Sequence, residues 1–326
     1  MIGSNLVKRL AAMECRVAVV DNLWRGKIDY LYEHGRPVID LDRSFHRIDL
    51  SVPGSIDHLV SGFDCVYHLA DVVAGISYVL NNSGNVFRQN LLINSNVTAS
   101  VRNSRRIQGF VYVGTACSYP AHKQTGVDAP PLIEEDVYPA APETAYGWSK
   151  LMGEYESLLM ERECGIPVCV PVLHNVYGTP CDFSGDRAQV IPSLARKAAR
   201  YPDEPFIVWG SGSQGRAFVH VDDVVSGLIA AMEKGLGCGT VQLGPDRCDT
   251  IRTIAETLVD ISGKDIPIVY DTSRPEGDRG RCANYSKARR LLGWEPRVTL
   301  RDGLTSLYKW VEEKVRATAA ASQASD

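Results

Sequence analysis

VGTACSYPAHKQ (residues 113–124) and ETAYGWSK (residues 143–150) open and close the most informative stretch of this 326-residue sequence. The apolar run that precedes Thr115 predicts a buried strand ending in a polar loop. Tyr146 and Lys150 are spaced Tyr-x-x-x-Lys on a predicted helix, so both side chains project from one face. Together with Cys117, the stretch supplies a hydroxyl, a thiol, a phenol and an ammonium group.

The Tyr146 and Lys150 pair can transfer a proton if a redox cofactor lies beside it. A free phenol has a pKa near 10, and a lysine together with a nicotinamide cation would lower it. Tyr146 would then take a proton from a substrate hydroxyl while hydride leaves the same carbon, with Thr115 hydrogen-bonded to that oxygen. The spacing alone also arises by chance among surface side chains. The strand before Thr115 strengthens the catalytic interpretation.

Cys117 lies two residues beyond Thr115 in the same predicted loop. A thiol there could act as base or acid toward a carbon made acidic by a neighbouring ketone. A buried structural cysteine is the alternative interpretation.

Around this stretch, predicted strands alternate with predicted helices, which indicates an α/β fold with a Rossmann-type, doubly wound parallel sheet. We expect residues 1–178 to form mainly a dinucleotide-binding domain and residues 179–326 mainly a smaller substrate-binding lobe. Residues of about 215–245 are expected to return to the first domain.

The N-terminus begins directly in a helical pattern, with no strand before it. Gly3 would suit the last glycine of a phosphate-binding loop, but the earlier glycines and their strand are absent, so the first strand of the sheet is expected to be missing. Asp21 ends the valine-rich strand 17–20, where such folds place the acid that binds an adenosine ribose. The alternative is an aspartate that only starts a turn.

Other predicted strand ends add possible cofactor contacts, although packing alone also explains these residues. They are Asp49 and Leu50 after one strand, Leu69 and Ala70 after the next, and Asn90 in the long helix that follows.

Arginines in two later loops offer a clue to the substrate. Arg216, Arg274, Arg279 and Arg281 lie near predicted strand ends. Guanidinium groups match phosphate geometry, so these residues favour a diphosphate ligand, with solvated surface arginines as the alternative.

Composition narrows the function classes. The net charge of -4 gives no basic field for nucleic acid, and no apolar run is long enough to span a bilayer. Nine cysteines at irregular spacings include no Cys-x-x-Cys pair, so we expect reduced thiols, a cytoplasmic location and no metal site.

These residues resemble the NAD-dependent sugar-nucleotide epimerases and dehydratases of the extended short-chain dehydrogenase/reductase superfamily. The resemblance extends from Gly3 to about Val315. The motifs ACSYP, PAAPETAYGWSK, HNVYG and RPEGDRGRCAN with LLGWEP are most similar to the GDP-mannose 3,5-epimerase subfamily.

The resemblance implies a role for each matching residue. Tyr146 and Lys150, assisted by Thr115, would oxidise carbon 4 of the sugar transiently, and Cys117 would exchange a proton at carbon 3 or 5. Asp21 and Asn22 would hold the adenosine ribose of NAD, and Asn90 would lie along the cofactor. Contacts to a nucleotide-diphosphate sugar would come from Asn175, Arg216, Arg279 and Arg281. A homodimer is also expected.

One position departs from the subfamily. The acid/base lysine that partners the cysteine falls at Gln189, which has no titrating proton. This predicts impaired or altered double epimerisation: one carbon only, a different acid such as His174 or Lys123, or carbon 4 chemistry alone.

The leading hypothesis is therefore an NAD-dependent sugar-nucleotide epimerase. A 4-epimerase, a 4,6-dehydratase or a 4-dehydrogenase on the same scaffold is the first alternative. A non-catalytic nucleotide-binding protein is the second.

Overall fold

A computed structural model of the chain describes residues 1–73, 75–185, 188–274 and 279–323. The helices are α1 (Ile2–Ala12), α2 (Leu41–Ser44), α3 (Asp57–Val60), α4 (Ile76–Asn81), α5 (Ser83–Asn103), α6 (Ala145–Cys164), α7 (Val190–Arg200), α8 (Val221–Lys234), α9 (Ile251–Ser262), α10 (Ser286–Leu292) and α11 (Leu300–Gln323). The strands of the N-terminal half are β1 (Val19–Val20), β2 (Tyr32–Glu33), β3 (Arg36–Pro37), β4 (Phe45–His46), β5 (Cys65–His68), β6 (Gly109–Tyr112), β7 (Gly114–Thr115) and β8 (Val168–Leu173). The later strands are β9 (Asn175–Tyr177), β10 (Ile207–Trp209), β11 (Gly215–Arg216), β12 (Phe218–His220), β13 (Gly239–Leu243), β14 (Asp249–Thr250) and β15 (Val269–Asp271).

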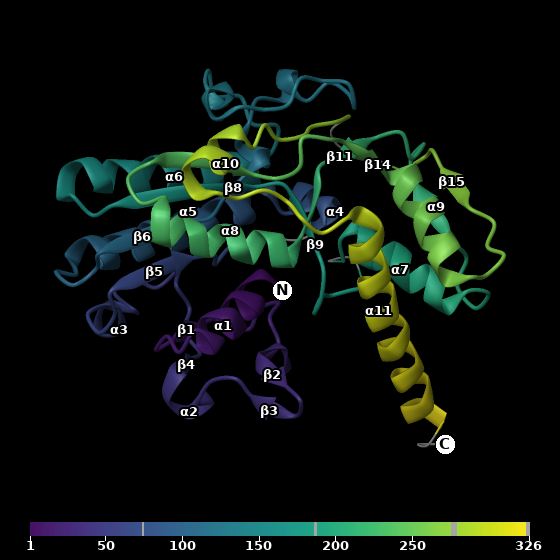
Figure 1. Cartoon of the computed structure of the whole chain (residues 1–326), viewed down its shortest axis with the longest axis horizontal. Coiled ribbons are helices and arrows are strands. Elements are labelled where there is room, and N and C mark those ends of the chain that lie inside the picture. Colours follow the sequence, from purple (N-terminus) through teal and green to yellow (C-terminus); the bar gives the residue numbers. More distant parts are fainter. Residues whose placement is uncertain (74, 186–187, 275–278, 324–326) are drawn as a thin grey trace.

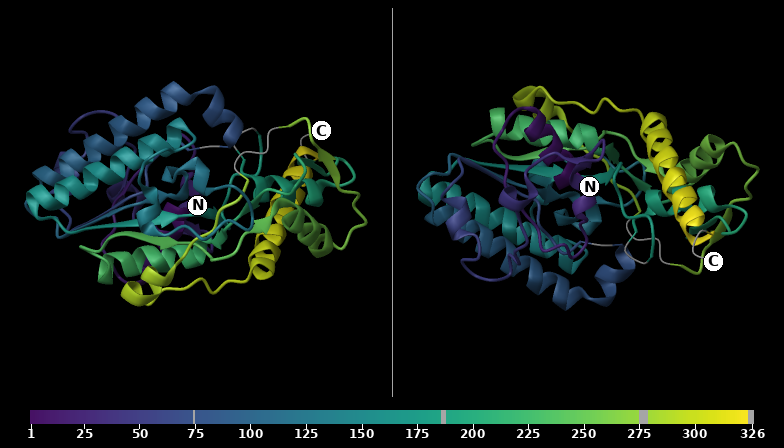
Figure 2. Two further views of the ribbon diagram at one scale, coloured as in Figure 1. Left: turned by 90° about the horizontal axis from the view of Figure 1, so that it is seen from above. Right: turned by 90° about the horizontal axis from the view of Figure 1, so that it is seen from below.

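A parallel sheet in the order β13-β8-β6-β5 forms the centre, with β7 also paired to β8. Figures 1 and 2 show α5 and α6 on one face of this sheet and α8 on the other. Helix α1 packs against α8. Every residue of β6 and β8 is buried, because helices cover both faces. The predicted doubly wound parallel sheet is confirmed.

The sheet is interrupted between β1 and β5. Among the described residues, β1 pairs only with β4, and β5 pairs only with β6. Arg16 spans this interval, since its guanidinium donates to the carbonyl of Gly62 and lies 4.4 Å from the centre of the Phe63 ring.

A second apolar core lies beside the sheet, between α7, α9 and α11. It includes Leu194, Ile254 and Leu307, all nearly inaccessible to solvent. Figure 1 shows these helices grouped with β15 at the opposite side of the molecule from α3 and β5.

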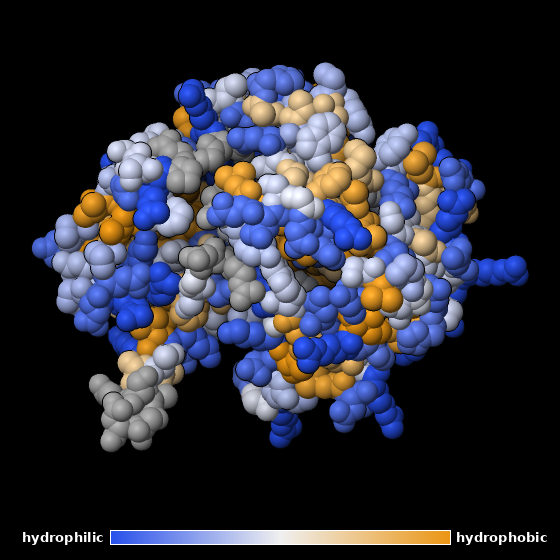
Figure 3. Space-filling model, turned by 180° about the vertical axis from the view of Figure 1, so that it is seen from behind, coloured by the Kyte–Doolittle hydropathy of each residue, from blue (hydrophilic) through white to orange (hydrophobic). Residues whose placement is uncertain are grey.

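The surface mixes polar and apolar groups. On the face shown in Figure 3, hydrophobic residues lie scattered among hydrophilic ones. In the part of the chain that the structure describes, no helix is both long enough and apolar enough to cross a bilayer.

Candidate active site

The candidate site forms at the carboxyl ends of the central strands. Thr115 is the last residue of β7, and its register partner in β8 is Leu173. Helix α6 contacts β7. It begins at Ala145, because Thr144 caps it by accepting a 3.1 Å hydrogen bond from the Gly147 N–H. Tyr146 and Lys150 follow in the first turns, which confirms the predicted helix.

Gly147 brings the start of α6 against the loop that carries Cys117. A Cβ atom at position 147 would lie 2.1 Å from the Cys117 carbonyl oxygen, which is well inside contact distance. The Ser118 hydroxyl also donates to the Gly147 carbonyl at 3.4 Å. The Tyr146 phenol and the Thr115–Cys117 loop can meet only because the residue after Tyr146 has no side chain.

The pKa of Tyr146 is raised well above its ordinary value, first by burial and then by the charges of Asp71 and Cys117. The neighbouring Thr115 side chain and Arg281 lower it and so act in the opposite direction. The isolated protein therefore holds Tyr146 as a neutral phenol.

Lys150 is paired with a buried acid, and its predicted effect on Tyr146 together with a nicotinamide cation stays a prediction. Its ammonium Nζ lies 2.7 Å from Asp71 Oδ2, and both side chains are buried. The same ammonium lies 4.3 Å from the centre of the Tyr112 ring, a favourable cation–π contact. Burial is the first cause of the raised pKa of Tyr146, and the charge of Asp71 is the second.

Asp71 retains one unused acceptor. Its Oδ1 atom is buried and has no hydrogen-bond partner among the described residues. Burial raises the pKa of this carboxyl, and the adjacent Lys150 lowers it. A buried acceptor of this kind is costly unless a ligand or water satisfies it.

Cys117 is held by an arginine from a distant part of the chain. The Arg281 guanidinium donates to its sulfur at 3.2 Å and to Gln124 Oε1 at 2.6 Å. Gly280 makes this approach possible, because a Cβ there would lie 2.3 Å from the carbonyl carbon of Gly126. Cys117 is partly accessible, so it is not merely a core side chain.

Gln189, which replaces the subfamily's lysine, and the two alternative acids have different surroundings. Gln189 is exposed at the start of α7. Burial lowers the pKa of His174 to about 3, so its ring is neutral, and it contacts Gln242 at 2.8 Å. Lys123 forms an ion pair with Asp136 at 2.7 Å on the surface.

The predicted adenosine contacts lie at the ends of β1 and β4. Asp21 Oδ1 accepts a 2.7 Å hydrogen bond from the Leu23 N–H, and Asn22 Oδ1 accepts one from the Trp24 N–H at 2.9 Å. Asp49 is exposed and accepts from the Ser51 N–H. Each side chain starts a local turn, so the turn interpretation of Asp21 holds alongside its binding role, which stays a prediction.

Asn90 is engaged within the protein. Its amide bonds both the N–H and the carbonyl of Val72, at 2.7 and 3.3 Å, and it is completely buried. It also donates to the Ser149 hydroxyl at 3.3 Å. Asn90 therefore fixes the loop after β5, so any effect on a cofactor would pass through that loop.

The remaining cofactor candidates are packing residues or open positions. Leu50 and Ala70 belong to one apolar cluster, and Leu69 belongs to another. A Cβ at Gly3 would meet no atom within 4 Å among the described residues, so close helix packing does not require this glycine.

Three of the four predicted substrate arginines come together in one ladder. The Gly215 N–H donates to the Arg279 carbonyl and the Ala217 N–H donates to the Arg281 carbonyl, which places both beside Arg216 in β11. Arg274 lies apart from this ladder. It is exposed, pairs with Asp271 at 3.4 Å and lies over the Trp209 ring. Residues 275–278 of the same motif lie outside the described residues.

Asn175 supports the predicted binding role. It begins β9, two residues beyond Leu173, so it lies on the same sheet edge as Thr115. Its Oδ1 atom is buried without a hydrogen-bond partner in the described part of the chain.

Sequence reasoning missed Asp71, Gly147 and Gln124. Asp71 lies three residues after the end of β5, and its position after a strand was a usable signal. Gly147 and Gln124 carried none, because their importance depends on contacts with Cys117 and Arg281 across the fold.

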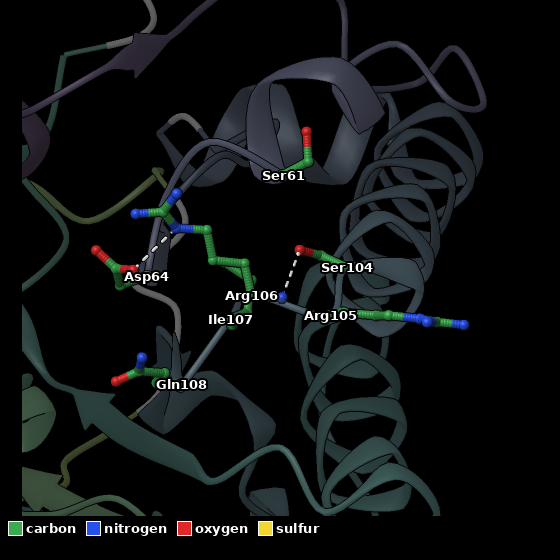
Figure 4. A pocket seen from close by; sticks show the side chains of 7 residues that line it. All are labelled: Ser61, Asp64, Ser104, Arg105, Arg106, Ile107 and Gln108. Atoms are coloured by element: carbon green, nitrogen blue, oxygen red, sulfur yellow. Dashed lines mark hydrogen bonds and ion pairs between the residues drawn. The ribbon is translucent and has the colours of Figure 1, made fainter.

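A surface hollow elsewhere is not part of this site. It is lined by Ser61, Asp64, Ser104, Arg105, Arg106, Ile107 and Gln108. Figure 4 shows Arg106 turned toward Asp64, and the two pair at 3.0 Å. This hollow lies at the amino ends of β5 and β6, which is the sheet edge opposite Thr115. In the described residues no cluster of His, Cys, Asp or Glu could hold a metal ion.

The chain is similar to known proteins over most of its length. GDP-mannose 3,5-epimerase 1 of Oryza sativa subsp. japonica is 29% identical over 314 residues, covering 96% of this chain and 80% of that protein. GDP-mannose 3,5-epimerase of Arabidopsis thaliana is 31% identical over 271 residues, covering 83% of this chain and 71% of that protein. The crystal structure of a UDP-glucose 4-epimerase from Thermotoga maritima superposes with a TM-score of 0.85 at 26% identity, over 97% of this chain and 96% of that one.

A family model matches residues 1–244, about three quarters of the sequence. The match includes the Thr115–Cys117 loop, α6 and Asn175. The chain belongs to the NAD dependent epimerase/dehydratase family.

Proposed function

We propose that this protein epimerises a nucleotide-diphosphate sugar, with transient oxidation at carbon 4 and proton exchange at carbon 3 or 5. The observation that carries the proposal is the sulfur of Cys117, which Arg281 holds by a hydrogen bond in the loop after Thr115, next to the start of α6 where Tyr146 lies. Similarity to GDP-mannose 3,5-epimerases over most of the chain supports the same class of substrate.

The residues present fit NAD. Asp71 Oδ1 is a buried acceptor that needs a partner, and it lies in the loop after β5, where ligands of such sheets bind. Asp21 would bind the adenosine ribose of NAD, and Lys150 would also contact the cofactor. When bound, NAD supplies a hydride acceptor and a positive charge near the Tyr146 phenol.

As a phenolate, which the positive charge of a bound cofactor would favour, Tyr146 would accept the proton of the sugar hydroxyl at carbon 4, with Thr115 orienting that oxygen. Cys117 would then remove a proton from a carbon next to the resulting ketone, because the ketone makes that position acidic. Arg281 keeps the sulfur in place, and Arg216, Arg279 and Asn175 would bind the sugar diphosphate.

A 4-epimerase is the second candidate. It is favoured by the positions of Gln189, His174 and Lys123, since an exposed amide, a neutral buried ring and a surface ion pair offer Cys117 no titrating partner. The structural similarity to a UDP-glucose 4-epimerase points the same way.

The test is to incubate candidate GDP- and UDP-sugars with the full chain and NAD in deuterated water. Solvent deuterium at carbon 3 or 5 is expected, and Cys117→Ser should abolish it. Tyr146→Phe should reduce turnover by about 10³-fold, as expected for loss of a general base. The matched control is Cys164→Ser, which changes an exposed cysteine at the far end of α6.

The outcomes separate the candidates. Turnover without deuterium exchange would reject the Cys117 step and establish the 4-epimerase. Lasting absorbance near 340 nm would indicate a net 4-dehydrogenase, and loss of water would indicate a 4,6-dehydratase. Absence of turnover with bound NAD would leave a nucleotide-binding protein.

A homodimer is part of the proposal. Trp148, Met152 and Tyr155 are exposed at helical spacing on α6, which presents an apolar stripe to solvent. Light scattering of the wild-type protein and of Met152→Glu tests it, because the charge should shift a dimer toward monomer. The cytoplasmic location stays a prediction.

A further inference from the structure

Two cysteines far apart in the sequence nearly touch at the edge of the sheet away from the candidate site. Cys169 lies in β8, and Cys238 lies in the turn between α8 and β13. Their sulfur atoms are 3.7 Å apart, although 69 residues separate them in the chain. Nothing in the proposed reaction uses either thiol.

The turn that carries Cys238 is built to hold this position. Gly237 and Gly239 both adopt left-handed conformations, with φ of 81° and 70°, which other residues rarely adopt. The Gly237 N–H donates to the Val168 carbonyl at 2.9 Å. Lys287 donates to the carbonyl of Cys238 at 3.1 Å. These bonds tie the turn to β8 on one side and to α10 on the other.

We propose that Cys169 and Cys238 are an oxidation site that forms a reversible disulfide bond. A disulfide requires sulfur atoms about 2.05 Å apart, so the pair must approach by about 1.7 Å. Side-chain rotation and a small shift of the turn can supply this movement. A Cβ at Gly239 would meet no atom within 4 Å in the described structure, so the turn has room to adjust.

The two thiols differ in a way that sets the order of reaction. Cys238 is partly accessible, whereas Cys169 is buried. The hydrogen bond with Cys169 and the Lys287 ammonium both lower the pKa of Cys238. The thiolate is the form of cysteine that attacks a peroxide, so the reaction with peroxide begins at Cys238.

The step balances with hydrogen peroxide as the oxidant. The Cys238 thiolate attacks one peroxide oxygen, giving a sulfenic acid and hydroxide. The Cys169 sulfur then attacks the Cys238 sulfur, and the sulfenic hydroxyl leaves as water with the Cys169 proton. Two thiols are oxidised by two electrons, and the peroxide is reduced to water.

The site is remote from the proposed chemistry. Leu173, the partner of Thr115, lies four residues along β8 from Cys169, about 13 Å at 3.3 Å per residue. The disulfide should therefore leave turnover unchanged. It should raise resistance to denaturant instead, because it closes a long loop in the unfolded chain.

The experiment treats the full chain with stoichiometric hydrogen peroxide, followed by thiol counting in denaturant and non-reducing peptide mapping. Two of the nine thiols should be lost, in a peptide that joins Cys169 to Cys238, and dithiothreitol should restore them. The urea midpoint of the oxidised protein should rise, and Cys238→Ser should show neither change. Cys164→Ser is the control and should behave as wild type.

Cys248 and Cys282 form the rival pair, since each affects the pKa of the other. A bridge between those two instead, or sulfinic acid at Cys238 without any bridge, would overturn the proposal. So would equal thiol loss in wild type and Cys238→Ser. Cys238 is partly exposed, so its serine variant should fold. Its circular dichroism spectrum and its turnover before oxidation verify that it does.

Discussion

The catalytic side and the adenosine side of the candidate site are held very differently. Tyr146 and Lys150 lie on a 20-residue helix that packs against α5 and the central sheet. Asp21 and Asp49 follow two-residue strands, β1 and β4, that pair only with each other in the described chain. The fold thus fixes the reacting groups through its core and the expected nucleotide contacts through local turns.

This difference assigns separate physical roles to the two sides. On the catalytic side, buried charges and close backbone contacts set the geometry, so substitutions there should cost stability as well as activity. On the adenosine side, the side chains are satisfied by neighbouring N–H groups, so substitutions should change affinity with little effect on folding.

Removing the charge of Asp71 should have the largest effect. Asp71→Asn leaves the Lys150 ammonium buried without its 2.7 Å partner, which should lower the free energy of unfolding by about 3–5 kcal/mol. Urea denaturation measures this. Glu33→Gln is the matched change in the N-terminal region. There Glu33 forms a 3.6 Å ion pair with Lys8, and the Glu33 side chain is about half exposed. It should cost less than about 1 kcal/mol. Equal losses would contradict the comparison.

A pair of glycine substitutions tests the packing difference directly. Gly147→Ala places a Cβ 2.1 Å from the Cys117 carbonyl oxygen, and the forced shift should cost about 3 kcal/mol. Turnover should fall together with stability, because Tyr146 moves away from Thr115.

Gly3→Ala is the matched change. A Cβ there meets no described atom within 4 Å, so the substitution should stabilise the chain by about 0.5–1 kcal/mol through helix propensity. Thermal unfolding measures the stability of both variants, and kcat measures their turnover. If Gly147→Ala changed neither quantity, the loop would not be held by the contact between Gly147 and the Cys117 carbonyl.

Glu154 makes the catalytic side sensitive to pH. It lies one turn beyond Lys150, only 3% exposed, and burial raises its pKa from 4.5 to about 7, opposed by the Thr240 hydrogen bond and by Lys150. A carboxyl with a raised folded pKa contributes stability that is complete below about 4.5 and is lost as the pH rises through about 7.

Unfolding of the wild type at pH 5 and pH 8 should therefore show a loss of about 2 kcal/mol at the higher pH that Glu154→Gln removes. An identical pH profile for the two proteins would mean that Glu154 is ionised throughout this range in the folded state.

The smallest effect is expected on the adenosine side. Asp21→Asn keeps an acceptor for the Leu23 N–H but removes the charge that a ribose hydroxyl would use. The Kd for NAD should rise on the order of 10-fold, about 1.4 kcal/mol, with no change in unfolding. Calorimetric titration measures this, with Asp29→Asn, an exposed acid nearby, as the control. Unchanged affinity would place the nucleotide elsewhere.

Much of the fold and part of the site could be predicted from the sequence. Alternating strands and helices predicted the parallel sheet, because hydrophobic periodicity is a local property of the chain. The common face of Tyr146 and Lys150 follows from helical spacing, and Thr115 at a strand end follows from the apolar run before it.

The electrostatics of the site could not be predicted this way. The sequence suggested that Lys150 and a nicotinamide cation together lower the pKa of Tyr146. In the protein alone, burial raises this pKa, and Asp71, 79 positions before Lys150 in the sequence, pairs with the lysine and adds to the rise. Helical spacing predicts which side chains lie on the same face of a helix. It does not predict which groups from distant parts of the chain will contact that face.

The sequence by itself determined the elements of this protein, the order of its strands and helices, and the family to which its motifs are similar. Only the tertiary structure decided which groups meet: Arg281 at the sulfur of Cys117 across 164 positions, Asp71 at Lys150, and the Cys117 carbonyl against Gly147. The physical reason is that periodicity and capping act within a few residues, whereas ion pairs, burial and close backbone contacts depend on distances that exist only after the chain has packed.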